Sequence, residues 1–222
     1  NTVNRRAFAG GVWFDGTDGS ATPEVFGDLF ENGGSLSCVV NITDNGLQEV
    51  IYDCRNGGGW TLFINPTSDS LQFNHQTTGT ILASSTPFAD YFGKDTVVTV
   101  SFDGTVDSSA PKFYLNGELV ATTAITTATG SLGFTTSIAK IGRKNSANED
   151  NLLGTLRDFA AFNFAIDSNQ AAEIATEGVG PWLARHPEYR WSTVLNPGTG
   201  AAAPNFNNFT TFTGSAQGFT AV

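Results

Sequence analysis

Short apolar runs separated by turn residues follow one another along most of this chain. The connections between them are rich in Gly, Asn, Asp and Pro, as in "TDNG" at 43–46 and "NPTSDS" at 65–70. Many short strands at such intervals are typical of antiparallel β-sandwiches. The pattern therefore predicts an all-β fold, a two-sheet antiparallel jelly-roll sandwich. The strand-like runs are 36–42, 48–54, 60–64, 71–76, 96–102, 131–135, 139–142 and 155–164.

The stretch "KFYLNGELVATT" at 112–123 predicts a β-hairpin. A two-residue type I′ loop needs positive φ at both central positions, which Asn116 tolerates and Gly117 adopts freely. Such a loop fixes the register, so Tyr114 pairs with Leu119. Because an isolated two-stranded ribbon is marginal in water, the hairpin must belong to a larger sheet.

One short helix is predicted over residues 168–177. Asp167 suits the N-cap, Gln170 completes a capping box, and Gly178 suits the position after the last turn. Beyond it, the sequence divides into an aromatic extension at 179–196 and a linker at 197–222 that leads into a packing segment or another module.

The last eighteen residues, 205–222, contain four Phe. Burial of each Phe is worth roughly 1.5–3 kcal/mol, so these side chains should pack against something. Because a linker-like "NPGTGAAAP" precedes them, we expect packing on a neighbouring chain or module rather than on the same sandwich. This predicts a homo-oligomer.

Composition excludes some classes of function. The chain has 222 residues, only 11 Lys plus Arg, and a formal net charge of −10. A basic face for nucleic acid is therefore not expected. No apolar stretch approaches the ~18 residues of a membrane span, so membrane insertion is not expected. Met is absent and the chain begins at Asn1, which suggests a processed product or a piece of a longer protein.

The order of several motifs resembles the laminin-G-like branch of the concanavalin A-like sandwiches. The match covers roughly residues 9–178, with 1–8 as a lead-in. The resemblance implies a jelly-roll fold and a mostly non-catalytic function in binding glycans or proteins. The motifs are "FDGTDG" (14–19), "VTVSFDG" (98–104), "FYLNGELV" (113–120), "KIGR" (140–143) and "GTLRDFAAFNFAI" (154–166).

The resemblance also implies a Ca²⁺ site on the rim, because Asp15 and Asp158 match acidic positions that lie close together in the family. Hard oxygen ligands of this kind suit calcium. The family often has two successive acids in its last strand, whereas this chain has Arg157 before Asp158. Arg157 would oppose a cation or pair with an acid. The loop 145–151 is a second candidate for the ion.

Aromatic faces and short amides are the usual tools for binding sugars. The alternative for Trp13 and Trp60 is a place in the core, because both lie inside strand-like runs. The candidate glycan-binding residues are Trp13, Trp60, Tyr91, Asn145 and Asn148.

No enzymatic activity is expected. Glycosidase relatives carry two carboxylates on one strand as Glu-x-Asp-x-x-Glu, and this chain contains no Glu-x-Asp. A carboxylate pair from different strands stays open. Neither His75 nor His186 lies near a nucleophile motif, and both are expected at the surface or at a strand end.

The two cysteines leave two alternatives open. Cys38 and Cys54 flank what is interpreted as a hairpin centred near Gly46, almost opposite each other. They form either two buried free thiols or a cross-strand disulfide, which is geometrically demanding.

Two hypotheses for function follow. The first is a non-catalytic structural or adhesive module of a virion, such as a phage tail, fibre or capsid-associated protein, with other virion chains as partners. The second is a secreted or cell-surface lectin-like module, or an accessory domain of a glycan-degrading enzyme. The protein is accordingly expected in the virion or at the extracellular surface.

Overall fold

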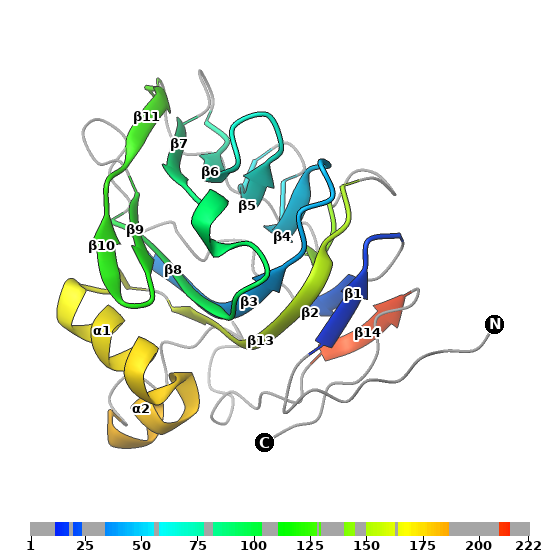
Figure 1. The fold of residues 1–222 in the computed structure, drawn as a ribbon. Helices are drawn as coiled ribbons and strands as arrows, with labels where there is room; N and C mark the ends of the chain where they lie inside the picture. The colour runs from blue at the N-terminus through cyan, green and yellow to red at the C-terminus, as the bar shows by residue number, and fades with distance from the viewer. Residues whose placement is uncertain are drawn as a thin grey trace.

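The structure is a computed structural model in which the strands form two antiparallel sheets (Figure 1). It describes residues 12–17, 20–23, 34–55, 58–77, 82–103, 111–127, 129, 140–144, 150–162, 164–186 and 209–213. Within these ranges, one sheet has six strands and the other has eight. The predicted all-β sandwich is confirmed.

The six-stranded sheet has the order β1-β13-β3-β8-β9-β10. Its strands are β1 (Val12–Asp15), β13 (Leu153–Phe162), β3 (Gly34–Ile42), β8 (Thr96–Phe102), β9 (Lys112–Leu115) and β10 (Glu118–Val120).

The eight-stranded sheet has the order β11-β7-β6-β5-β4-β12-β2-β14. Its strands are β11 (Thr123–Thr126), β7 (Leu82–Pro87), β6 (Ser70–His75), β5 (Trp60–Asn65), β4 (Glu49–Asp53), β12 (Lys140–Ile141), β2 (Ser20–Pro23) and β14 (Phe209–Thr213). A single turn of 3-10 helix, η1 (Ala89–Tyr91), follows β7.

The main core lies between the two sheets. Alternate residues of β3, such as Leu36 and Val40, point into it, as strand geometry requires. From the other sheet, Trp60 stacks on Tyr52 with ring centroids 4.1 Å apart. His75 ends β6 as expected but is buried, with its ring edge-on to Phe102.

The two cysteines lie in different sheets. Cys38 belongs to β3 of the six-stranded sheet, whereas Cys54 follows β4 of the eight-stranded sheet. The interpretation of 36–54 as one hairpin is therefore wrong, because β3 pairs with β8 and β13 instead of β4. Both thiols are free and buried.

Two helices cover the outer face of the six-stranded sheet (Figure 1). The predicted helix is α1 (Ser168–Glu177), and its capping box is present: Asp167 accepts hydrogen bonds from the N–H groups of Asn169 and Gln170, both at 2.9 Å. The second helix, α2 (Val179–Arg185), was not predicted. Its Pro181 lies in the first turn, where the missing N–H would have no intrahelical partner anyway. Among the described residues, no helix is long and apolar enough to cross a membrane.

Strand β14 adds five residues to the end of the eight-stranded sheet. Its backbone pairs with β2 of the same chain, with Phe212 opposite Ala21. The sequence analysis favoured packing of residues 205–222 on another chain. The backbone of residues 209–213 instead pairs with a strand of the same sandwich. The contacts of the side chains at 209–213 lie outside what the structure describes, so the expected oligomer stays a prediction.

Glu49 joins the two sheets at one end of the sandwich. It is the first residue of β4, and its Oε2 accepts a hydrogen bond from the backbone N–H of Leu153, the first residue of β13. The other carboxylate oxygen is buried as well. Burial raises the pKa of Glu49 to about 7; the Leu153 N–H opposes this rise and the Asp44 carboxylate adds to it.

This buried carboxyl predicts that stability falls as the pH rises. The folded chain binds the Glu49 proton more tightly than the unfolded chain. The stability that this proton contributes is therefore fully present below the unfolded pKa of about 4.3, and it is lost as the pH rises through the folded pKa of about 7. We expect a loss of up to about 3 kcal/mol from this group. Urea unfolding of wild type and Glu49→Gln across this pH range measures it, and parallel profiles for the two proteins would contradict the prediction.

The hairpin of β9 and β10 packs against α1. The predicted register is confirmed, with Leu119 opposite Tyr114. Asn116 and Gly117 have φ of 53° and 83°, as a primed turn requires. A Cβ on Gly117 would lie 2.8 Å from Ala172 Cα and 2.9 Å from the Cβ of Ala175 in the helix. The turn therefore packs against the backbone of α1 in addition to connecting β9 to β10.

Gly117→Ala should lower the free energy of unfolding by about 2–3 kcal/mol, because it combines positive φ with a clash against helix backbone. Gly46→Ala is the matched control: Gly46 has φ +70°, but an added Cβ there meets nothing within 4 Å. We expect about 1–2 kcal/mol for the control. Equal losses in denaturant melts would show that the helix contact contributes nothing.

Candidate functional site

A pocket of about 260 Å³ opens on the outer face of the six-stranded sheet. Its floor is formed by β3, β8 and β13, and one wall is the end of α1 with the residues that lead into α2, 174–179. Ser37, one of the residues of this floor, is buried and joined to Thr99 by a hydrogen bond. The pocket lies where the helix ends.

A β-bulge in β13 sets which side chains reach the pocket. The register of β13 against β3 shifts between Arg157 and Ala160. Leu156 and Phe159 both point into the main core, so one residue between them must be extra. The bulge places Asp158 at the surface with φ of 51°, a conformation that Asp tolerates better than most residues. Without it, alternation would turn this carboxylate into the core.

Arg157 is held between two carboxylates. Its guanidinium lies 3.1 Å from Asp158 Oδ2 and 2.9 Å from Asp95 Oδ2. Asn41 donates a further hydrogen bond to Asp95 at 2.9 Å. The hydrogen bonds from Asn41 and Arg157 hold the pKa of Asp95 below its usual value. The sequence left open whether Arg157 would pair with an acid, and this pairing is confirmed.

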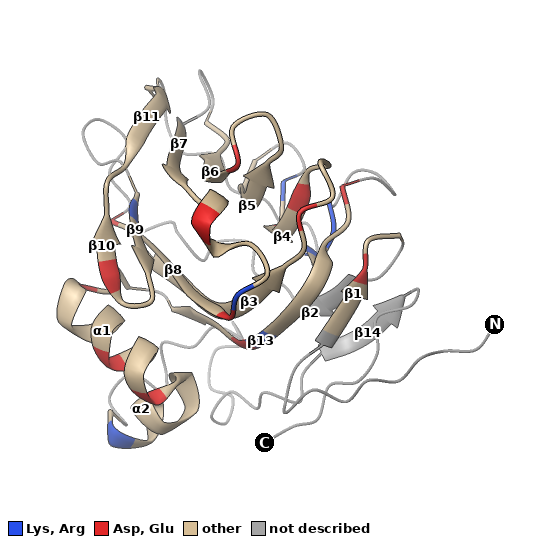
Figure 2. Cartoon of the chain, viewed as in Figure 1, with Lys and Arg blue, Asp and Glu red and all other residues tan. Residues whose placement is uncertain are grey.

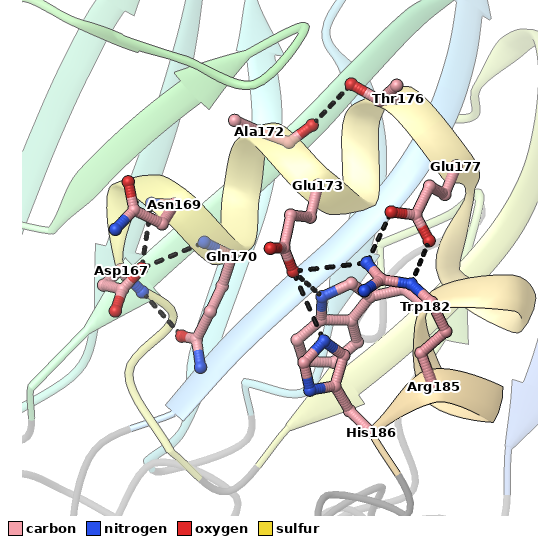
Figure 3. Close-up of polar contacts among 10 residues, drawn as sticks. All are labelled: Asp167, Asn169, Gln170, Ala172, Glu173, Thr176, Glu177, Trp182, Arg185 and His186. Carbon is pink, nitrogen blue, oxygen red and sulfur yellow. Dashed lines mark hydrogen bonds and ion pairs between the residues drawn. The ribbon is translucent and has the colours of Figure 1, made fainter.

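A second charge cluster fixes the helix pair beside the pocket (Figure 3). The Arg185 guanidinium binds the Glu177 carboxylate through both Nε and Nη2, the former at 2.8 Å. Glu173 accepts a hydrogen bond from Trp182 Nε1 at 2.8 Å and lies 3.4 Å from His186 Nε2. Hydrogen bonding to Glu177 raises the pKa of Arg185. Glu177 thus reaches the pocket already oriented by α2.

The structure does not bring Asp15 and Asp158 together. Asp15 pairs with Leu153, five residues before Asp158 on the same strand; because one of these residues belongs to the bulge, the separation along the strand is roughly 13 Å. Asp15 instead accepts hydrogen bonds from the N–H and hydroxyl of Thr17, at 3.0 and 2.6 Å. The register places the two residues at different positions along β13, and the calcium site predicted for them stays a prediction. Within the described ranges, no group of three or more His, Cys, Asp or Glu could hold a metal.

The predicted glycan-binding residues have different outcomes. Trp60 is 2 % exposed and belongs to the core, so it is not available to a ligand. Trp13 is half-buried on β1, and Tyr91 is half-buried with its ring centroid 5.4 Å from that of Phe88. Asn145 and Asn148 lie outside the described residues, so a sugar or calcium site in their loop stays a prediction.

Sequence reasoning missed most of the pocket. Val97 and Glu177 lie far from Arg157 in the chain, and no local motif connects them. One signal was present: Arg157 stands where the family often has an acid. That departure marked the strand on which the pocket is built.

Comparison with solved structures supports the fold. The receptor binding domain of botulinum neurotoxin C/D mosaic serotype matches with a TM-score of 0.54 at 15 % identity, covering 74 % of this chain and 46 % of that one. The binding domain of botulinum neurotoxin DC in complex with SialylT matches with a TM-score of 0.52 at 19 % identity, covering 69 % and 37 %. This chain thus spans less than half the length of either toxin domain.

The native heptameric SAP-like pentraxin from Limulus polyphemus matches with a TM-score of 0.52 at 13 % identity, covering 76 % of this chain and 83 % of that one. No curated protein matches this sequence. A family model described as "Concanavalin A-like lectin/glucanases superfamily" (Laminin_G_3) matches residues 14–172. This chain therefore belongs to the concanavalin A-like lectin/glucanases superfamily.

Proposed function

We propose that this chain is a non-catalytic carbohydrate-binding module of a secreted, cell-surface or virion protein. The observation that carries the proposal is the pocket at the end of α1, where Arg157, Asp158 and Glu177 surround apolar floor residues. Membership of a lectin and glucanase superfamily agrees with this, although fold alone does not assign a function.

The chemistry of the pocket suits sugars. Planar carboxylates and a guanidinium offer paired acceptors and donors to adjacent hydroxyl groups. The side chains of Val39 and Val97 supply apolar surface for the C–H faces of a sugar ring. At about 260 Å³ the pocket is smaller than the usual 300–1,000 Å³ of drug-sized sites, so it fits a ligand of one or two rings.

The charge state of Asp95, which lies beside the pocket and pairs with Arg157, agrees with binding rather than catalysis. A glycosidase general acid needs a raised pKa so that it holds its proton near neutral pH. The pKa of Asp95 is instead lowered, chiefly by hydrogen bonds from Asn41 and Arg157. We therefore expect the glycans that bind this chain to remain uncleaved when reducing ends are assayed.

Substitution of the pocket guanidinium tests the proposal. A glycan array identifies ligands of the full chain, and Arg157→Met should weaken their binding at least about tenfold, because two hydroxyl contacts and the balance of charge are lost. Lys112→Met removes an exposed positive charge on β9, outside the pocket lining, and should leave affinity unchanged. Backbone amide shifts in NMR titrations should map to 174–179. Unaltered affinity of Arg157→Met would place the site elsewhere.

A structural module of a virion is the second candidate. The observation that favours it is β14, the end strand of the eight-stranded sheet, since an end strand offers backbone groups for pairing with another chain. Oligomerisation would follow, as in the heptameric pentraxin.

Light scattering on the full chain and on a chain that lacks 205–222 tests this second candidate. Loss of assembly in a still folded shorter chain supports it, and a monomeric full chain counts against it.

A further inference from the structure

We infer that the pocket selects its sugar by charge, accepting neutral and amino sugars and rejecting uronic and sialic acids. The inference rests on the proposed function, because it assigns a ligand class to the same pocket. It follows from how the charged groups around the pocket are already paired.

Each guanidinium at this site faces two carboxylates. Arg157 lies within 3.1 Å of both Asp95 and Asp158. Arg185 is bound by Glu177 and lies 3.5 Å from Glu173. The two clusters together hold four carboxylates and two guanidinium groups, with His186 near one of them. The local charge is therefore negative even with every ion pair intact. Figure 2 marks the acidic positions along α1 and the basic position at the end of α2.

The wall of the pocket joins two helix ends of opposite partial charge, so the negative field comes from the carboxylates. α2 begins at Gly178 and Val179 with backbone N–H groups, whereas the last turn of α1 presents backbone carbonyls, which carry the partial negative charge of the helix dipole. This turn contains no basic residue. Hydroxyl and ammonium groups can donate hydrogen bonds to such a wall, whereas a ligand carboxylate has nothing to donate and is repelled.

An acidic sugar would also have to compete for Arg157. The guanidinium N–H groups of Arg157 that face Asp95 and Asp158 are already in ion pairs with these acids. Both acids would stay close to an incoming ligand carboxylate. The side chains are 35–58 % exposed, so solvent screens this repulsion. We expect it to change affinity by about five- to tenfold at low salt.

The test compares matched ligands on the full chain. A sugar that binds on the array is titrated by calorimetry as the neutral hexoside, the 2-amino-2-deoxy form and the 6-carboxylate. We expect the amino form to bind at least about fivefold tighter than the carboxylate, with a gap that narrows in about 0.5 M salt. A carboxylate that binds as tightly as the amino form overturns the inference and leaves the proposed function standing. Binding of no sugar overturns both.

Charge-neutralising variants show whether these carboxylates cause the preference. Asp158→Asn keeps a residue that tolerates φ of 51°, and Glu177→Gln provides a second variant if the first does not fold. Each should reduce the ratio of amino-sugar to acid affinity by about threefold or more. Asp69→Asn makes the same change in net charge at φ 44°, in the β5–β6 turn of the other sheet, and should leave the ratio unchanged. Equal ratios in all four proteins would overturn the inference.

Discussion

The alternation of side chains along β13 is the constraint on which both faces of this molecule depend. This strand lies between β1 and β3, and it supplies residues to the main core and to the helix-covered face. Leu156, Phe159 and Ala161 face inward, whereas Ala160 and Phe162 face the helices. A regular strand cannot satisfy both sets, because its side chains alternate with a period of two. The bulge at Asp158 resolves the conflict, and it leaves a carboxylate at the surface beside Arg157.

The exit of β13 then fixes where the helices lie. Ser35 donates a hydrogen bond to the Phe164 carbonyl at 2.9 Å and accepts one from the Ile166 N–H at 2.8 Å. These bonds turn the chain back over the sheet just before the Asp167 cap of α1. Trp182 of α2 meets Phe162 edge-on, with ring centroids 5.9 Å apart. The wall of the pocket is therefore positioned by this packing together with the hydrogen bond from Trp182 Nε1 to Glu173.

Local features of the fold could be predicted from the sequence, and long-range ones could not. The register of the 112–120 hairpin and the capping box of α1 depend on neighbouring residues alone, and both are confirmed. The division of β3 and β4 between two sheets depends on pairing with strands far along the chain. Counting residues between the two cysteines therefore gave a wrong hairpin. Strand β7 was missed because "LASSTP" contains no aromatic residue and no Val or Ile, and ends in Ser, Thr and Pro. The pocket was missed for the same reason as the sheet order: its residues meet only after folding.

The ion pairs at the pocket give it rigidity as well as charge. A free arginine loses much side-chain entropy when it binds a ligand. Here the guanidinium of Arg157 is already oriented by Asp95 and Asp158, and the carboxylate of Glu177 is oriented by Arg185. Exposed ion pairs of this kind add little to the stability of a fold. Their value lies in holding hydrogen-bonding groups at fixed positions, which a small polar ligand such as a sugar needs if it is to bind without first ordering its site.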